Sequence, residues 1–132
     1  MNDYADAAER HFVSAEAMRN AHPATASDCY GIAAECVLKA LMSNLQPQVN
    51  RVSGKHIGAS LWAEFANHQT LQTHPSRIAG AIKYQSGFNG WDIGQRYLNR
   101  MSAEFAEAKV SAQHQSARSL LGLLQLVQRG LA

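Results

Sequence analysis

The stretch GIAAECVLKALM, residues 31–42, constrains the fold more than any other part of the sequence. On a helix, apolar side chains cover most of its circumference: Ile32, Ala33, Cys36, Val37, Ala40 and Leu41. A helix that is apolar on nearly all sides has to pack against several neighbours. The stretch therefore predicts a central helix, which we expect to run from Thr25 or Ser27, either of which can cap it, to about Asn44.

The end of the chain carries a second strong helical pattern. Positions 103, 106, 110, 113, 117, 120, 124, 127 and 131 alternate in steps of three and four, and eight of these nine residues are apolar. This spacing is typical of the buried seam of a helix in a bundle. It predicts a long final helix.

Two further helices and a loop are expected between and before these segments. Apolar spacing predicts a first helix over residues 3–20 and a third over residues 57–70. Residues 73–84 predict a short extra helix because a proline suits its first turn. Residues 85–92 read as a loop pinned by its two aromatic side chains, Phe88 and Trp91. The predicted fold is all-α, a four-helix up-and-down bundle with a short extra helix in the third connection.

Length and composition limit the class of protein. The 132 residues are 46% apolar and 17% charged, which is typical of one globular domain spanning residues 1–132. No run of about 20 apolar residues is present, so no membrane partner is expected. The N-terminal residues lack the apolar core of a signal peptide, and a cytoplasmic location is expected. Cys29 and Cys36 lie two helical turns apart, too far for a disulfide, and are expected to be reduced and buried.

The charge is unevenly distributed along the chain. Residues 1–50 hold three Lys/Arg and six Asp/Glu, a balance of −3, whereas residues 51–132 hold nine and four, a balance of +5. A basic second half is compatible with a phosphate-bearing partner such as RNA, and also with an ordinary solvated surface.

Glu35 and Lys39 interrupt the apolar central helix and can be interpreted in two ways. Standing four residues apart with the acid first, they can form an exposed pair worth a few tenths of a kcal/mol. Alternatively, Glu35 is partly buried and bonded to other helices, because an isolated buried carboxylate is costly. In that case we expect Arg96 or Tyr97 as its partner and His11 next, while the long stem of Lys39 carries its charge to water.

Four segments in order resemble a known family: AERHFVSAEAM, YGIAAECVLKALM, KHIGASLWAEF and FNGWDIGQRYL. Together they are similar to a bacterial branch of the HEPN superfamily (higher eukaryotes and prokaryotes nucleotide-binding), over roughly residues 4–126. The resemblance implies an up-and-down helical bundle that often dimerises. Many relatives are encoded beside a minimal nucleotidyltransferase or act as RNA-cleaving toxins, so a nucleotide, RNA or nucleotidyltransferase partner and a toxin–antitoxin-like role are implied.

The RNA-cleaving members of that family carry an Arg and, after four to six intervening residues, a His. The Arg stabilises charge developing on the phosphate, and the His transfers a proton without a metal. The one match here, Arg51 and His56, precedes the third predicted helix rather than opening the last one. Neither Arg96 nor Arg100 has a His within the seven residues that follow it.

The leading hypothesis is therefore a non-catalytic HEPN-like module that binds a nucleotide, RNA or a partner protein. Its polar site between helices would be formed by Arg10, His11, Glu35, Lys39, His56, Arg96 and Tyr97. A first alternative is a ribonuclease that uses Arg51 or Arg96 with His56 or His11. A second is a module that only dimerises.

Two further expectations concern partners and metals. Six apolar residues near the C-terminus span more than one helix face, which predicts a homodimer: Leu120, Leu121, Leu123, Leu124, Leu126 and Val127. Glu64 and His68 stand four apart, but a surface pair is a better interpretation of them than a metal site. We expect neither a metal nor another cofactor.

Overall fold

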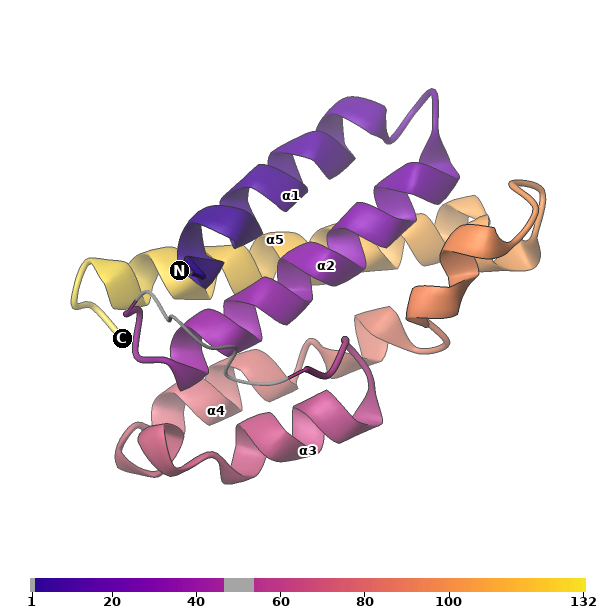
Figure 1. Ribbon diagram of the computed structural model, residues 1–132. Helices are drawn as coiled ribbons and strands as arrows, with labels where there is room; N and C mark the ends of the chain where they lie inside the picture. Colours follow the sequence, from indigo (N-terminus) through magenta and orange to yellow (C-terminus); the bar gives the residue numbers. More distant parts are fainter. Residues whose placement is uncertain (1, 47–53) are drawn as a thin grey trace.

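The computed structural model describes residues 2–46 and 54–132, and they form an all-helical fold around one central helix (Figure 1). Three helices are long: α1 (Tyr4–Met18), α2 (Pro23–Met42) and α5 (Glu107–Gln128). In Figure 1, α2 crosses the middle of the molecule, with α1 above it, α5 behind it and two shorter helices below it. The all-α prediction is confirmed.

Shorter elements make up the connection between α2 and α5. The two short α-helices are α3 (Ala59–Asn67) and α4 (Pro75–Ile82). Four 3-10 helices complete this part of the chain: η1 (Gln69–Thr73), η2 (Gln85–Phe88), η3 (Ile93–Tyr97) and η4 (Ala103–Phe105). In the described residues, no helix is long and apolar enough to span a membrane.

The central position predicted for the apolar helix that contains residues 31–42 is confirmed. Fourteen of the twenty residues of α2 are buried, including Glu35 and Lys39. The helix begins at Pro23, earlier than the predicted start at Thr25 or Ser27, because proline at the first position fits the fixed backbone angle of a helix start. Its end at Met42 is followed by Asn44 in a left-handed conformation, with φ of 51°.

The seam of the last helix is confirmed over its central part. Positions 110, 113, 117, 120, 124 and 127 are all buried in α5. The helix is shorter than predicted at both ends: Ala103 belongs to η4, and Leu131 is exposed beyond Gln128. The seam spacing extended by chance into residues that have no facing helix to pack against.

The predicted third helix is shorter than expected, and the extra helix is present. The segment expected to reach Thr70 leaves the α-helix at Asn67 and continues as η1. Pro75 opens α4 as predicted, since its missing N–H costs nothing at a helix start. Residues 85–92 are not a loop throughout, because they begin with η2; the expected pinning of this segment by Phe88 and Trp91 is confirmed, since both are buried.

Trp91 fixes this loop against the first half of α2. Its indole Nε1 donates a hydrogen bond of 2.8 Å to the backbone oxygen of Ser27. The ring lies directly over Gly31, where an added Cβ would stand only 2.0 Å from Trp91 Cε2. Gly31 therefore serves a close approach between helix and ring, and the hydrogen bond prevents the ring from moving aside.

We predict that Gly31→Ala destabilises the protein although alanine is the better helix former. Overpacking a fixed contact costs about 1–3 kcal/mol. Gly122→Ala is the matched control, because its added Cβ meets nothing within 4 Å in α5 and should stabilise the helix by about 1 kcal/mol. Urea denaturation measures both free energies of unfolding. A Gly31→Ala variant as stable as Gly122→Ala would contradict the Trp91 contact.

Candidate functional site

Glu35 is the centre of a buried polar cluster on α2. Its side chain is 9% exposed, and its Oε2 accepts a 2.9 Å hydrogen bond from Lys39 Nζ one turn later. Lys39 is still less exposed, at 2% of its side chain. The buried interpretation of Glu35 is thus confirmed, and the exposed pair is excluded.

The second partner of Glu35 is His56, in the segment that leads into α3. His56 Nδ1 lies 3.0 Å from Glu35 Oε1. Because an ionised carboxylate can only accept, Nδ1 carries the hydrogen, which leaves Nε2 of the neutral ring as an acceptor. The His56 side chain is 42% exposed, so the ring extends from a buried carboxylate to solvent.

Lys39 contacts the start of α1 as well as Glu35. Its Nζ lies 5.8 Å from the centroid of the Tyr4 ring, within the range of a cation–π interaction. The expectation that Lys39 carries its charge to water is wrong. Packing of α1 over this end of α2 covers the ammonium group, which the carboxylate and the ring then stabilise.

His11 faces the same cluster from α1. Burial lowers the pKa of its half-buried ring, the nearby charge of Arg10 lowers it further, and Glu35 counteracts both. His11 is therefore within electrostatic range of Glu35, although Lys39 and His56 hold the two carboxylate oxygens. The expected order of partners, with His11 after Arg96 and Tyr97, is corrected by this arrangement.

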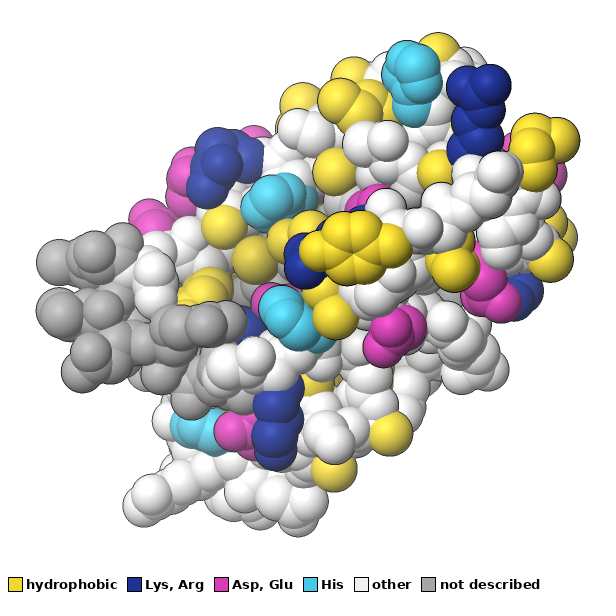
Figure 2. All heavy atoms as spheres, turned by 45° about the vertical axis from the view of Figure 1, so that its right-hand side comes forward, with side chains coloured by type: hydrophobic (Ala, Val, Ile, Leu, Met, Phe, Trp, Pro, Cys, Tyr) yellow, Lys and Arg dark blue, Asp and Glu magenta, His cyan; other side chains and the backbone are white. Residues whose placement is uncertain are grey.

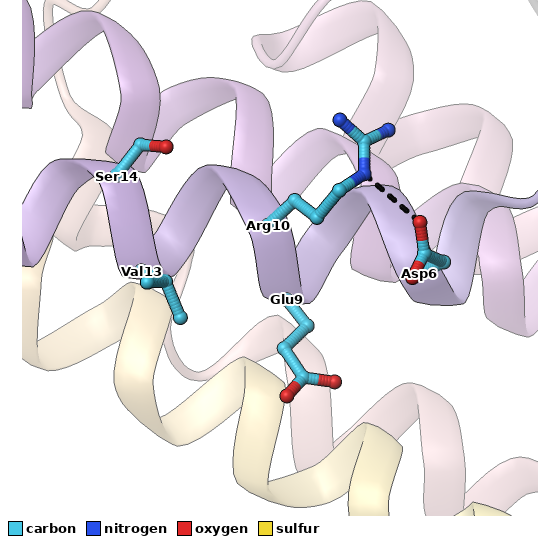
Figure 3. Close-up of a pocket in the computed structure, with 5 residues that line it drawn as sticks. All are labelled: Asp6, Glu9, Arg10, Val13 and Ser14. Carbon is cyan, nitrogen blue, oxygen red and sulfur yellow. Dashed lines mark hydrogen bonds and ion pairs between the residues drawn. The ribbon is translucent and has the colours of Figure 1, made fainter.

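Arg10 lies on the outer face of α1, away from the buried carboxylate. Its Nε pairs with Asp6 at 2.9 Å, and both side chains are more than 60% exposed. Figure 3 shows this pair at one end of a shallow hollow, with Glu9, Val13 and Ser14 along the same helix. An exposed pair of this kind contributes only a few tenths of a kcal/mol.

Arg96 and Tyr97 are not partners of Glu35, which corrects the expected hub. The Arg96 guanidinium carbon lies 5.0 Å from the Tyr97 ring centroid, and Tyr97 is 79% exposed. Gln95 fixes η3 over the start of α2, with its Nε2 donating to Ser27 Oγ at 2.9 Å and to Asp28 Oδ1 at 3.0 Å. Because Asp28 precedes Glu35 by two turns of α2, the residue that holds η3 and the buried carboxylate lie about 10 Å apart along the helix.

The described residues give no support to the Arg51–His56 match or to a metal site. Arg51 lies outside the described residues, so its pairing with His56 stays a prediction. Within residues 2–46 and 54–132, no three His, Cys, Asp or Glu side chains are grouped closely enough to hold a metal ion. The chemistry within reach of Glu35 is hydrogen bonding and proton transfer through the His56 ring.

The two cysteines are free thiols, as expected. Cys36 is buried, and burial together with the neighbouring charge of Glu35 raises its pKa to about 12. Cys29 is only half-buried, and burial also raises its pKa. A protonated thiol is a poor nucleophile, so neither residue supports thiolate chemistry.

A second polar cluster joins the three long helices and was missed from the sequence. The Tyr30 hydroxyl donates to Glu16 Oε1 at 2.6 Å, and His114 Nδ1 contacts the same oxygen. Burial raises the pKa of Glu16, but these hydrogen bonds outweigh burial and lower it overall. These residues lie 14 to 98 positions apart, so no local spacing could have revealed the cluster. Its contacts are satisfied within the fold, and it therefore serves as a structural link.

We predict that breaking the buried pair from either side is costly. Glu35→Ala strands the Lys39 ammonium and Lys39→Ala strands the carboxylate, so each should lose about 3–5 kcal/mol of unfolding free energy. The joint replacement Glu35→Leu with Lys39→Met should lose less than the sum of the single changes, because it leaves no unpaired charge.

Arg10→Ala is the matched control, because it breaks an exposed pair with the same spacing on α1. It should cost less than about 1 kcal/mol. Guanidinium denaturation measures all four variants. Small, equal losses in the Glu35, Lys39 and Arg10 variants would show that the pair is solvated rather than buried.

Comparisons with known proteins found no match. No protein-family profile, curated protein or solved structure matches the chain.

Proposed function

We propose that the chain is a non-catalytic HEPN-like module that binds a nucleotide, or a nucleotide of an RNA, at the Glu35–His56 site. The observation that carries the proposal is the orientation of His56. Glu35 holds its Nδ1 at 3.0 Å, and the other ring nitrogen has no hydrogen-bond partner among the residues that the structure describes. A side chain fixed by a buried charge but 42% exposed is well suited to contact a ligand.

The ligand chemistry follows from the properties of this histidine. As a neutral ring, its Nε2 accepts a hydrogen bond from a ribose hydroxyl or a base amino group. In a protonated ring both nitrogens are donors, so Nε2 can donate a hydrogen bond to a phosphate oxygen instead. The nearby His11 ring adds a second imidazole on the side of α1.

The fold supports the same proposal. We interpret α1, α2, the α3–α4 pair and α5 as the four arms of an up-and-down HEPN-like bundle, in which α3 and α4 together take the place of the third helix. Under this interpretation, residues 1–132 are one domain. This domain would work with a minimal nucleotidyltransferase or in a toxin–antitoxin-like pair.

We also propose a homodimer, though on a smaller surface than the sequence suggested. The chain itself buries Leu120, Leu121, Leu124 and Val127, so the six residues do not all need a partner. Leu123 and Leu126 remain on the outer side of α5, beside a groove that Lys83 and Tyr84 of the α4 end also line. A second copy packed here would cover Leu126, which is 41% exposed.

The nucleotide proposal is tested by isothermal titration calorimetry with AMP, ATP, GTP and UTP. At least one should bind, and His56→Ala should weaken that binding at least tenfold, which corresponds to a lost hydrogen bond to a charged group of about 1.5–3 kcal/mol. His74→Ala is the matched control, because His74 precedes α4 and its side chain makes no capping hydrogen bond. Equal affinities in wild type and His56→Ala would refute the site, and no binding at all would favour a purely structural module.

The alternative function is a metal-independent ribonuclease, and the orientation of His56 favours it too. A carboxylate that fixes the tautomer of a histidine also prepares it for general base catalysis. Incubation of end-labelled single-stranded RNA with the protein in excess EDTA tests for this activity. The non-catalytic proposal predicts no cleavage above that of His56→Ala, whereas cleavage lost in that variant would establish the enzyme.

The dimer is tested by light scattering at micromolar concentration. Wild type should give the mass of two chains, and Leu126→Lys should give the mass of one, because a charged side chain would be buried at the interface. Val13→Lys, which changes an apolar side chain on α1 that is still more exposed, should leave the dimer intact. A monomeric wild type would disprove the proposal.

A further inference from the structure

The segment RYLNRM, residues 96–101, exposes an unusual amount of apolar surface. Tyr97 is 79% exposed, Leu98 46% and Met101 85%. Within the described part of the chain, seven large apolar side chains are exposed, and three of them fall in these six residues. Such a concentration on a surface marks an interaction site.

This segment is held in place rather than free to collapse. Asp92 caps η3, and Gln95 both completes the capping box and hydrogen bonds to Ser27 and Asp28 of α2. After η3, the Asn99 side chain accepts from the backbone N–H of Met101 at 2.8 Å. The apolar side chains are thus presented to solvent by a supported backbone, which folding alone does not require.

Tyr97 and Arg96 together form a stacking surface. The guanidinium carbon lies 5.0 Å from the ring centroid, so the two planar groups occupy one place on the surface. Burial raises the pKa of the nearby Asp28. The hydrogen bond from Gln95 and the positive charge of Arg96 lower this pKa in part, so Arg96 lies within electrostatic range of Asp28. Every nucleic-acid base has an aromatic face, and an exposed Tyr next to an Arg can stack on it regardless of sequence.

A pocket of about 380 Å³ lies beside Arg100, three residues after Tyr97 in the same segment. Its walls are residues 21–25, which comprise the end of the α1–α2 connection and the start of α2, together with Arg100 and Met101. Arg100, His22 and the Thr25 hydroxyl can donate hydrogen bonds there, and no carboxylate lines it. In the described part of the chain, Arg100 forms no ion pair, so its charge is available to an anion.

Figure 2 turns this end of the molecule forward. Lys and Arg side chains, several histidines and scattered Asp and Glu side chains are distributed over the visible face, between patches of exposed hydrophobic atoms. An extended ligand that alternates flat apolar groups with negative charges matches this pattern better than an acidic peptide, which would leave the stacking face of Tyr97 without a planar partner.

We propose that residues 96–101 form a binding surface for single-stranded RNA, in which a base stacks on Tyr97 and a backbone phosphate enters the pocket beside Arg100. This inference rests on the proposed function in taking the ligand to be built from nucleotides, and it adds a second contact region apart from His56. Tyr97 and Arg100 lie at most about 11 Å apart along the chain, a distance that a flexible strand can bridge. Double-stranded RNA, whose bases are already stacked, should bind more weakly.

The experiment measures fluorescence anisotropy of a labelled single-stranded oligouridylate of about 12 nucleotides, a length within the usual site sizes. Tyr97→Ala should weaken binding about 5- to 150-fold, the range that corresponds to one lost base stack. Tyr97→Phe, which keeps the ring, should remain within about twofold of wild type. Arg100→Ala should weaken binding and lower the slope of log affinity against log salt by about 0.7.

The controls separate this inference from the nucleotide site. Mononucleotide binding by calorimetry should be the same in Tyr97→Ala and wild type, since Gln95 holds η3 at Asp28, two helical turns before Glu35, the partner of His56. If the mononucleotide binds but the oligouridylate binds equally in Tyr97→Ala, the inference is wrong and the function at His56 stands. If RNA binding depends on Tyr97 while no mononucleotide binds, the inference stands and the His56 site fails. Absence of RNA binding in wild type overturns the inference and leaves a protein partner for this surface.

Discussion

The structure depends on the two charged side chains that its central helix, α2, buries against its neighbours. Glu35 and Lys39 stand on the most buried element, 2.9 Å apart, where a lone charge would be too costly to keep. Each therefore requires its neighbours: the Tyr4 ring brings α1 over Lys39, and His56 brings the start of the α3 segment to Glu35. The pair adds little net stability compared with apolar side chains, but it restricts how α1 and the α3 segment can sit on α2.

The same helix positions both of the surfaces that we propose to bind ligands. Toward its C-terminal half, Glu35 orients His56 with one nitrogen at the surface. Toward its N-terminal half, Ser27 and Asp28 hold Trp91 and Gln95, and these in turn support the exposed segment with Tyr97. A change in the packing of α2 would therefore disturb both the proposed nucleotide contact and the proposed RNA surface.

Sequence patterns predicted the helices well because their causes are local. The apolar periodicity of α5, the proline at the start of α4 and the nearly uncharged run in α2 act within a few residues. The burial of Glu35 followed from its apolar surroundings. Its pairing with Lys39 followed from their spacing, but its contact with His56 could not be predicted, because His56 is 21 residues away and reaches it only through the tertiary fold. Lys39 was wrongly placed in water for the same reason, since Tyr4 and α1 cover it. The contacts of Tyr30 with Glu16 and His114 depend on three helices meeting.

The central claim is that ionised Glu35 fixes the ring of His56, and NMR of that ring tests it most directly. Long-range proton–nitrogen correlation spectra distinguish the two neutral tautomers of each histidine. With Nδ1 donating to Glu35, the His56 signals should show a protonated Nδ1 and an unprotonated Nε2 at high pH, and Glu35→Ala should abolish this preference. A His56 ring protonated at Nε2 in the wild type, or one with the same tautomer populations in the variant, would contradict the account.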